Sequence, residues 1–149
     1  MKSQFIPLAA MTQALCAPAL AQPAAPVSVA TDSAVFVEKV MADSSSRLEP
    51  AARLSRGDKV VTVVTWYRMG GNGGFVITNP MPAKLAYEAS ANEGQEVSVD
   101  GGRTWGHLGA LRKGGRMATA EDVTHVRWRI PAGRAAHGRG QLAYSAIVR

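Results

Sequence analysis

Residues 59–68 read KVVTVVTWYR, and this run decides the fold class. Its β-branched and aromatic residues repeat with a period of two, which is the period of a strand and not of a helix. The two faces of such a strand would be Val60, Thr62, Val64 and Trp66, and Val61, Val63, Thr65 and Tyr67. Because both faces are largely apolar, we expect a central strand.

Two later runs show the same period. In residues 123–130 the alternation places Thr124, Val126, Trp128 and Ile130 on one face and His125, Arg127 and Arg129 on the other. Residues 142–148 place Leu142, Tyr144, Ala146 and Val148 on one face. A strand with one apolar and one polar face covers the core on one side and meets water on the other.

Shorter candidate strands lie at residues 35–40, 75–78, 85–89, 96–99 and 103–108, with Gly-, Pro- and Asn-rich turns between them. Many short strands separated by such turns predict an all-β domain, a β-sandwich of about seven to eight strands. The chain is long enough for one domain of this kind. We expect a core of Val60, Val64, Trp66, Val76, Val126, Trp128, Leu142 and Tyr144.

The first residues differ from the rest of the chain. Residues 1–21 carry one charge, Lys2, followed by a mostly apolar stretch that ends in Ala19-Leu20-Ala21. This pattern predicts a secretory signal peptide, with a disordered tail or a wrongly assigned start as the alternatives. The stretch is too interrupted to predict a membrane span. Residues 22–33 are rich in Pro, Ala and Ser and predict a linker, so the domain would occupy residues 34–149.

Cleavage after Ala21 would remove Cys16, the one cysteine of the chain. The exported form, periplasmic or extracellular, would then contain neither disulfides nor thiol chemistry. Without Lys2 it would carry 16 basic and 11 acidic residues, a formal charge of +5. Such a surface attracts anionic polymers weakly and in a salt-dependent manner.

Several segments in order carry a family resemblance: RGDKV at residues 56–60, VITNPMP at 76–82, SVDGGRTW at 98–105 and DVTHVRW at 122–128. Together they resemble the bacterial conserved repeat domain (domain of unknown function eleven), in its single-copy exported proteobacterial form. The resemblance covers residues 34–149 and implies an immunoglobulin-like sandwich in exported or cell-surface proteins, with no general activity. The sequence departs from the family pattern at Arg68, where Asn is usual, and at Thr62, where Tyr is frequent.

The segment Ser98-x-Asp100-x-Gly102-x-Thr104-Trp105 fits the Asp-box pattern of sialidases. We interpret it as a structural turn: Asp100 would accept backbone hydrogen bonds, Gly102 would supply an unusual backbone conformation, and Trp105 would pack beneath. A propeller needs several such blades, and this chain has one copy. A glycan hydrolase would also need two positioned carboxylates.

Other residues suggest no catalytic or cofactor site. His107, His125 and His137 lack the close spacing of metal ligands, so we expect surface histidines and no metal. Asp122 and His125, three residues apart, would lie on opposite faces of a strand and would form no catalytic pair. The glycines at 70–74 precede neither Lys-Ser/Thr nor a helix, so no phosphate loop is predicted. We therefore expect a protein that is not an enzyme and has no cofactor.

Arginines crowd the second half of the chain, and Arg127, Arg129 and His125 would share one face of a strand. Because Trp128 would point the other way, into the core, it would offer no platform for bases, and nucleic acid is not a predicted partner. The arginines would form a solvated stripe.

Three functions remain open. The first is an exported, non-catalytic structural or interaction module of the bacterial envelope. The second is a binding module whose basic face contacts an anionic envelope polymer or an acidic protein. The third, which lacks the carboxylate pair, is an Asp-box glycan hydrolase.

Overall fold

The computed structural model describes residues 25–149, and antiparallel strands dominate them, with 54% of these residues in strands and 8% in helices. The all-β prediction is confirmed at this level. The strands are β1 (Ser28–Val40), β2 (Ser46–Pro50), β3 (Lys59–Gly70), β4 (Phe75–Pro80), β5 (Leu85–Ser90), β6 (Gln95–Ser98), β7 (Arg112–Lys113), β8 (Arg116–Met117), β9 (His125–Ile130) and β10 (Arg139–Val148). The helices are short: η1 (Leu108–Ala110), η2 (Ala120–Asp122) and α1 (Ala132–Ala135).

The larger sheet has five strands in the order β2-β1-β3-β10-β5. The strand β3 lies in its middle, as its two apolar faces predicted, and pairs with β1 on one side and β10 on the other. Across these strands Val63 lies opposite Ala34 of β1 and Ala143 of β10. The face that includes Val63 is only half-buried because it points away from the second sheet.

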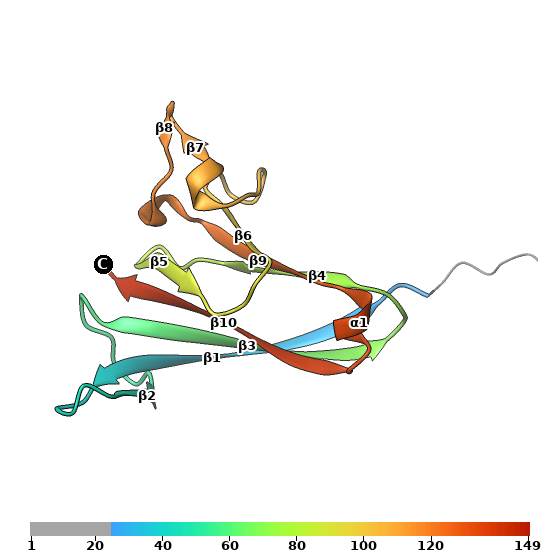
Figure 1. The fold of residues 1–149 in the computed structure, drawn as a ribbon, viewed down its shortest axis with the longest axis horizontal. Coiled ribbons are helices and arrows are strands. Elements are labelled where there is room, and N and C mark those ends of the chain that lie inside the picture. The colour runs from blue at the N-terminus through green and yellow to red at the C-terminus, as the bar shows by residue number, and fades with distance from the viewer. Residues whose placement is uncertain (1–24) are drawn as a thin grey trace, which may run out of the picture.

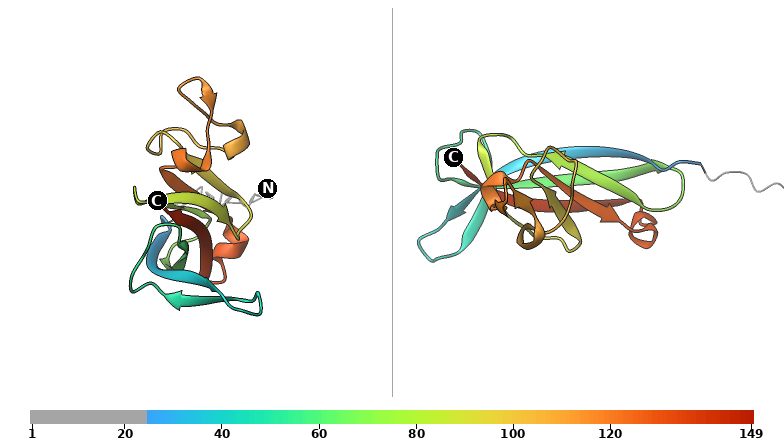
Figure 2. Two further views of the ribbon diagram at one scale, coloured as in Figure 1. Left: turned by 90° about the vertical axis from the view of Figure 1, so that its left-hand side faces the viewer. Right: turned by 90° about the horizontal axis from the view of Figure 1, so that it is seen from above.

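The smaller sheet has three strands in the order β4-β9-β6. Its central strand β9 places Trp128 opposite Ile77 of β4 and Val126 opposite Val97 of β6. In Figure 1 this sheet lies above the long strands β1, β3 and β10. Figure 2 (left) places the β7–β8 hairpin at one extremity of the molecule and the β1–β2 hairpin at the other.

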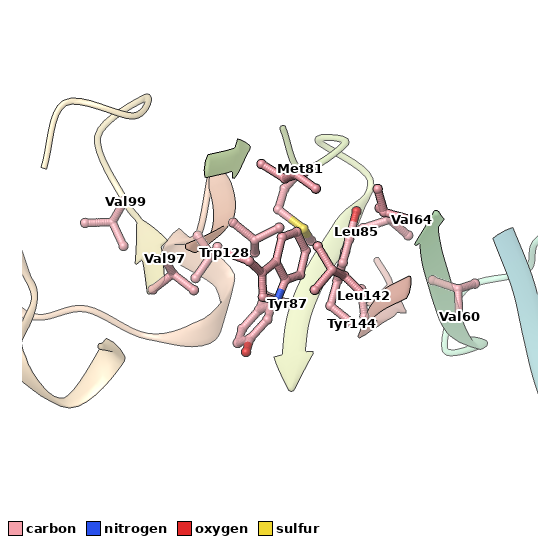
Figure 3. Packing of buried hydrophobic residues seen from close by; sticks show 14 of the residues in the cluster. Val60, Val64, Met81, Leu85, Tyr87, Val97, Val99, Trp128, Leu142 and Tyr144 are labelled. Atoms are coloured by element: carbon pink, nitrogen blue, oxygen red, sulfur yellow. The ribbon is translucent and has the colours of Figure 1, made fainter. Parts of the chain in front are cut away.

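The core forms between the two sheets. Along β3, Val60, Thr62, Val64 and Trp66 are all buried, and along β9 the buried residues are Val126, Trp128 and Ile130. Figure 3 shows Trp128 at the centre of the labelled cluster, between Val97 of β6 and Leu142 of β10. The alternation that the sequence predicted for residues 123–130 and 142–148 therefore matches the burial of these strands.

The assignment of one residue to the predicted core is wrong. Val76 is 48% exposed, whereas its neighbour Ile77 is buried. Phe75 points inward, and its ring meets the ring of Trp66 edge-on with centroids 5.2 Å apart. Because side chains alternate along a strand, Ile77 points inward as well. This register turns Val76 to the outer face, opposite Arg129.

The predicted N-terminal boundary is also partly wrong. The expected signal peptide, residues 1–21, lies outside the described residues, as do residues 22–24 of the expected linker. Residues 28–33, however, form the first half of β1 and pair with β3, where Ser33 lies opposite Val64. Thr31 and Ser33 lie on the face of β1 that turns inward further along the strand, but both are exposed there. Polar residues at these positions leave no apolar alternation, so the sequence predicted a linker.

Residues 103–108 do not form the predicted strand. They are a loop in which Gly106 makes an isolated bridge with Val97, and η1 follows at once. The cause is the Asp100 turn, which folds the chain back over β6. The sequence predicts none of the three strands β2, β7 and β8: β2 is exposed at all five residues, and β7 and β8 have two residues each.

Candidate functional site

The Asp-box segment forms a tight turn after β6, built around Asp100. Its Oδ1 accepts hydrogen bonds from the backbone N–H of Thr104 (2.9 Å), the N–H of Arg103 (3.1 Å) and the hydroxyl of Ser98 (2.8 Å). Its Oδ2 accepts the Thr104 hydroxyl at 2.7 Å. The bonds from Thr104, with those from Ser98 and Arg103, hold the pKa of Asp100 well below its ordinary value. The carboxylate is therefore ionised and occupied by its own turn.

Gly102 and Ser98 close the other side of the turn. Gly102 has φ +88°, a conformation that favours glycine, and its N–H donates to the Ser98 hydroxyl at 2.9 Å. The Gly102 carbonyl accepts the indole N–H of Trp105 at 2.9 Å. Ser98 is fully buried, and its carbonyl accepts the N–H of Thr124 just before β9. The structure thus brings Asp100, Gly102 and Trp105 into one turn and ties that turn to the central strand of the smaller sheet.

Trp105 lies on the outer face of the three-stranded sheet and is half-buried there. The guanidinium carbon of Arg127 lies 4.4 Å from the centroid of its ring, which is a cation–π distance. The His125 ring meets Trp105 edge-on, with centroids 6.4 Å apart. His125 Nδ1 lies 3.1 Å from the Thr124 hydroxyl. The turn therefore supplies an aromatic surface for the polar side chains of β9.

Arg127 and Arg129 share one carboxylate. Glu96 Oε2 accepts Arg127 Nε at 2.8 Å and Arg129 Nε at 3.2 Å. The bond from Arg127 is the main cause that lowers the pKa of Glu96 below its ordinary value. The two arginines differ in exposure, because the Arg127 side chain is 17% exposed and that of Arg129 is 63% exposed.

This arrangement corrects the prediction of a solvated arginine stripe. Arg127 is held between Glu96 and Trp105, whereas Arg129, which also donates to Glu96, has a largely exposed side chain. The reason is the register of β6 on β9, which places Glu96 directly opposite Arg127. Sequence reasoning placed Glu96 on a strand but missed its role, because nothing local to residues 96–99 indicates which strand lies beside them.

The remaining candidate residues lie apart. Asp122 binds Arg116 through both guanidinium nitrogens, at 2.7 and 2.8 Å, and accepts the N–H of Thr119 at 2.8 Å. Asp122 belongs to η2 and not to a strand, and its carboxylate is bound to Arg116 and Thr119, not to His125. His107 and His137 are exposed. Within residues 25–149, no group of three His, Cys, Asp or Glu side chains could hold a metal ion.

The outer face of the five-stranded sheet carries a shallow groove of about 390 Å³. Its floor is made of small and apolar side chains that include Val61 and Ala143. At one end Lys59 Nζ lies 3.0 Å from Glu38 and 3.4 Å from Glu88. The two carboxylates outnumber the lysine by one, so the apolar floor of the groove is flanked by a group with one negative charge in excess.

Comparison with protein-family models, with curated proteins and with solved structures gives no significant match. Among residues 25–149, none of the helices is long and apolar enough to cross a bilayer.

Proposed function

We propose that this chain is an exported, non-catalytic interaction module of the bacterial envelope, an immunoglobulin-like sandwich of the conserved repeat type. The observation that carries the proposal is the hydrogen bonding of the Asp100 carboxylate within its own turn. All four hydrogen bonds that its carboxylate accepts come from residues 98–104, and its pKa is lowered. A general acid in glycan hydrolysis needs a raised pKa and a second carboxylate across the scissile bond. Asp100 meets neither requirement of the hydrolase hypothesis.

Two features support an immunoglobulin-like sandwich: the two packed sheets, and the positions of two turns. Two antiparallel sheets enclose one core, and the Gly57-Asp58 turn, with Gly57 at φ +89°, opens the central strand β3. The corner at residues 79–82 begins within the end of β4, and Met81 just after that strand is buried in the core. These are the places where the resemblance to the conserved repeat domain predicts a turn, a strand and a corner.

Two measurements test export: the cellular location of the protein and its N-terminal residue. We expect that a bacterial host producing the full chain exports it and that N-terminal sequencing of the exported protein starts at Gln22, after Ala19-Leu20-Ala21. Recovery of the chain in the cytoplasm, still starting at Met1, would contradict both the cleavage and the localisation.

A second candidate is binding of an anionic polymer through the outer face of the three-stranded sheet. The observation that favours it is the pair Arg127 and Arg129, which face one Glu96 and leave one positive charge in excess, with Arg129 largely exposed. The indole of Trp105 beside them adds an apolar surface of the kind that stacks on sugar rings. The face would thus suit an acidic polysaccharide or an acidic protein.

Polygalacturonate is a suitable probe for this second candidate. We expect binding that weakens as salt is added and that Arg129→Ala weakens further, since screening and loss of charge act on the same attraction. Lys39→Ala removes an exposed cation from the other sheet and is the matched control. Equal loss in both variants would show that net charge alone, and not this face, attracts the polymer.

A further inference from the structure

The β7–β8 hairpin stands apart from the two sheets that enclose the core. Its strands pair with each other and form a two-stranded sheet of their own. Every residue from 112 to 117 is exposed, and Figure 2 (left) shows the hairpin at one extremity of the molecule. Its side chains therefore contribute little to the core.

The contacts at its turn and at its base fix the hairpin in place. The turn residues Gly114 and Gly115 have φ +56° and +81°, the positive values that a two-residue hairpin turn of this kind requires. At the base, the N–H of the buried Ala118 donates to the Leu111 carbonyl at 2.9 Å, and Leu111 packs against the core. An isolated two-stranded hairpin is only marginally stable, so these contacts hold it as a defined protrusion.

The hairpin is strongly basic. It contains no acidic residue and three cations, Arg112, Lys113 and Arg116. The contacting carboxylate is that of Asp122, which Arg116 binds through both guanidinium nitrogens and which lies 3.7 Å from Lys113 Nζ. The other acid of η2, Glu121, accepts Arg149 at its backbone carbonyl (3.0 Å), so a further cation lies beside it. Three cations against one carboxylate leave two positive charges in excess.

The two faces of the hairpin differ. Cross-strand partners share a face, and the register pairs Lys113 with Arg116 and Arg112 with Met117. Since Lys113 and Arg116 both contact Asp122, their face turns toward η2. The opposite face presents Arg112 beside Met117, which is 45% exposed. A cation and an exposed apolar side chain thus lie side by side on the outward face.

We propose that the β7–β8 hairpin is a docking site for a bilayer surface that contains anionic phospholipids. Lipid phosphates neutralise the two excess charges, while Met117 enters the apolar boundary below the headgroups. Charge alone suits any polyanion, but a soluble polyanion offers Met117 no apolar partner. The bilayer surface therefore fits both features of the outward face. The site is separate from the outer face of the three-stranded sheet, and its test does not depend on export or on ligand binding there.

Co-sedimentation of the full chain with lipid vesicles tests the proposal. We expect stronger binding to vesicles of phosphatidylglycerol and phosphatidylcholine in equal parts than to phosphatidylcholine alone, and the difference should disappear in high salt. The neutral vesicles measure any binding through the apolar residues 1–21, which every variant shares. A wild type that binds both kinds of vesicle equally would overturn the proposal.

A pair of double variants separates the hairpin from net charge. Arg112→Gln with Lys113→Gln keeps the ion pair of Arg116 at the base and should weaken binding to the anionic vesicles at least about tenfold. Lys39→Gln with Arg53→Gln removes two exposed cations elsewhere and should weaken this binding less than about threefold. Equal losses in the two double variants would mean that net charge, and not the hairpin, attracts the lipid.

Met117→Gln separates a lipid surface from a soluble polyanion. The variant keeps every charge, so any binding of inorganic polyphosphate should be unchanged, whereas binding to the anionic vesicles should fall at least about threefold with the lost apolar contact. If the variant binds the vesicles as well as the wild type does, or loses polyphosphate to the same extent, Met117 does not enter the lipid and the proposal fails.

Discussion

The guanidinium of Arg127 lies over the ring of Trp105, 4.4 Å from its centroid, although 22 positions separate the two residues in the chain. This contact joins the Asp100 turn to the central strand of the three-stranded sheet. It gives Arg127 a structural role that Arg129, two residues further along the same face, does not share.

Arg127→Ala should therefore destabilise the fold by about 1 to 2 kcal/mol, the combined scale of a half-buried cation–π contact and a charge-assisted hydrogen bond. Arg129→Ala should change the stability by less than about 0.5 kcal/mol, as exposed substitutions do. Urea denaturation of the two variants measures the difference. Equal losses would mean that neither Glu96 nor Trp105 holds Arg127 in place.

Gly140→Ala should be strongly unfavourable, because a Cβ at this position would lie 2.5 Å from Cζ2 of the Trp66 ring. Trp66 is fully buried and cannot move aside, so we expect a loss of about 1 to 3 kcal/mol. Gly133→Ala is the control, since a Cβ there meets no atom within 4 Å. If both variants have the melting temperature of the wild type, the described packing of β10 on Trp66 is wrong.

Trp128→Ala should cost about 3 to 5 kcal/mol, the usual loss when a large aromatic side chain leaves a core. The side chain is 1% exposed, and its indole N–H lies 3.4 Å from the Ser90 hydroxyl. Val76→Ala, on the outer face of β4, should cost less than about 0.5 kcal/mol. If chemical denaturation shows a larger loss of unfolding free energy for Val76→Ala than for Trp128→Ala, the inner and outer faces of the smaller sheet are assigned the wrong way round.

The inward faces of the long strands could be predicted from the sequence, because burial leaves a period of two in the residue types of β3, β9 and β10. Val76 was misplaced because both Val76 and Ile77 are apolar, and only the register with Trp128 decides which of them faces inward. The first half of β1 was missed because polar side chains such as Thr31 and Ser33 leave no apolar period.

At the candidate site, the residues of the Asp100 turn could be predicted because its hydrogen bonds are local in sequence. The partnership of Glu96 with Arg127 spans 31 positions and depends on the pairing of β6 with β9, which local patterns do not encode. The expected strand at residues 103–108 failed for a related reason: Trp105 covers the outside of the sheet and does not extend it.

The lowered pKa of Asp100 also predicts a pH dependence. Its carboxylate is stabilised in the folded chain relative to an ordinary value of 3.8, so the stabilisation is present above that pH and is lost as the pH falls below it. The advantage in melting temperature of the wild type over Asp100→Asn should therefore shrink below about pH 4. A constant Asp100→Asn difference down to acidic pH would contradict the assigned hydrogen bonds.

Thermal melts of Asp100→Ala and Asp100→Asn, run beside a sialoside hydrolysis assay, separate a structural role of Asp100 in its turn from a catalytic one. Alanine leaves the N–H groups of Arg103 and Thr104 without their acceptor, so its melting temperature should fall clearly. Asparagine keeps an acceptor oxygen and should recover most of that loss, with no hydrolysis by any of the three proteins. Equal melting temperatures of the three proteins, together with wild-type hydrolysis that Asp100→Asn abolishes, would show that Asp100 is catalytic and does not stabilise the turn.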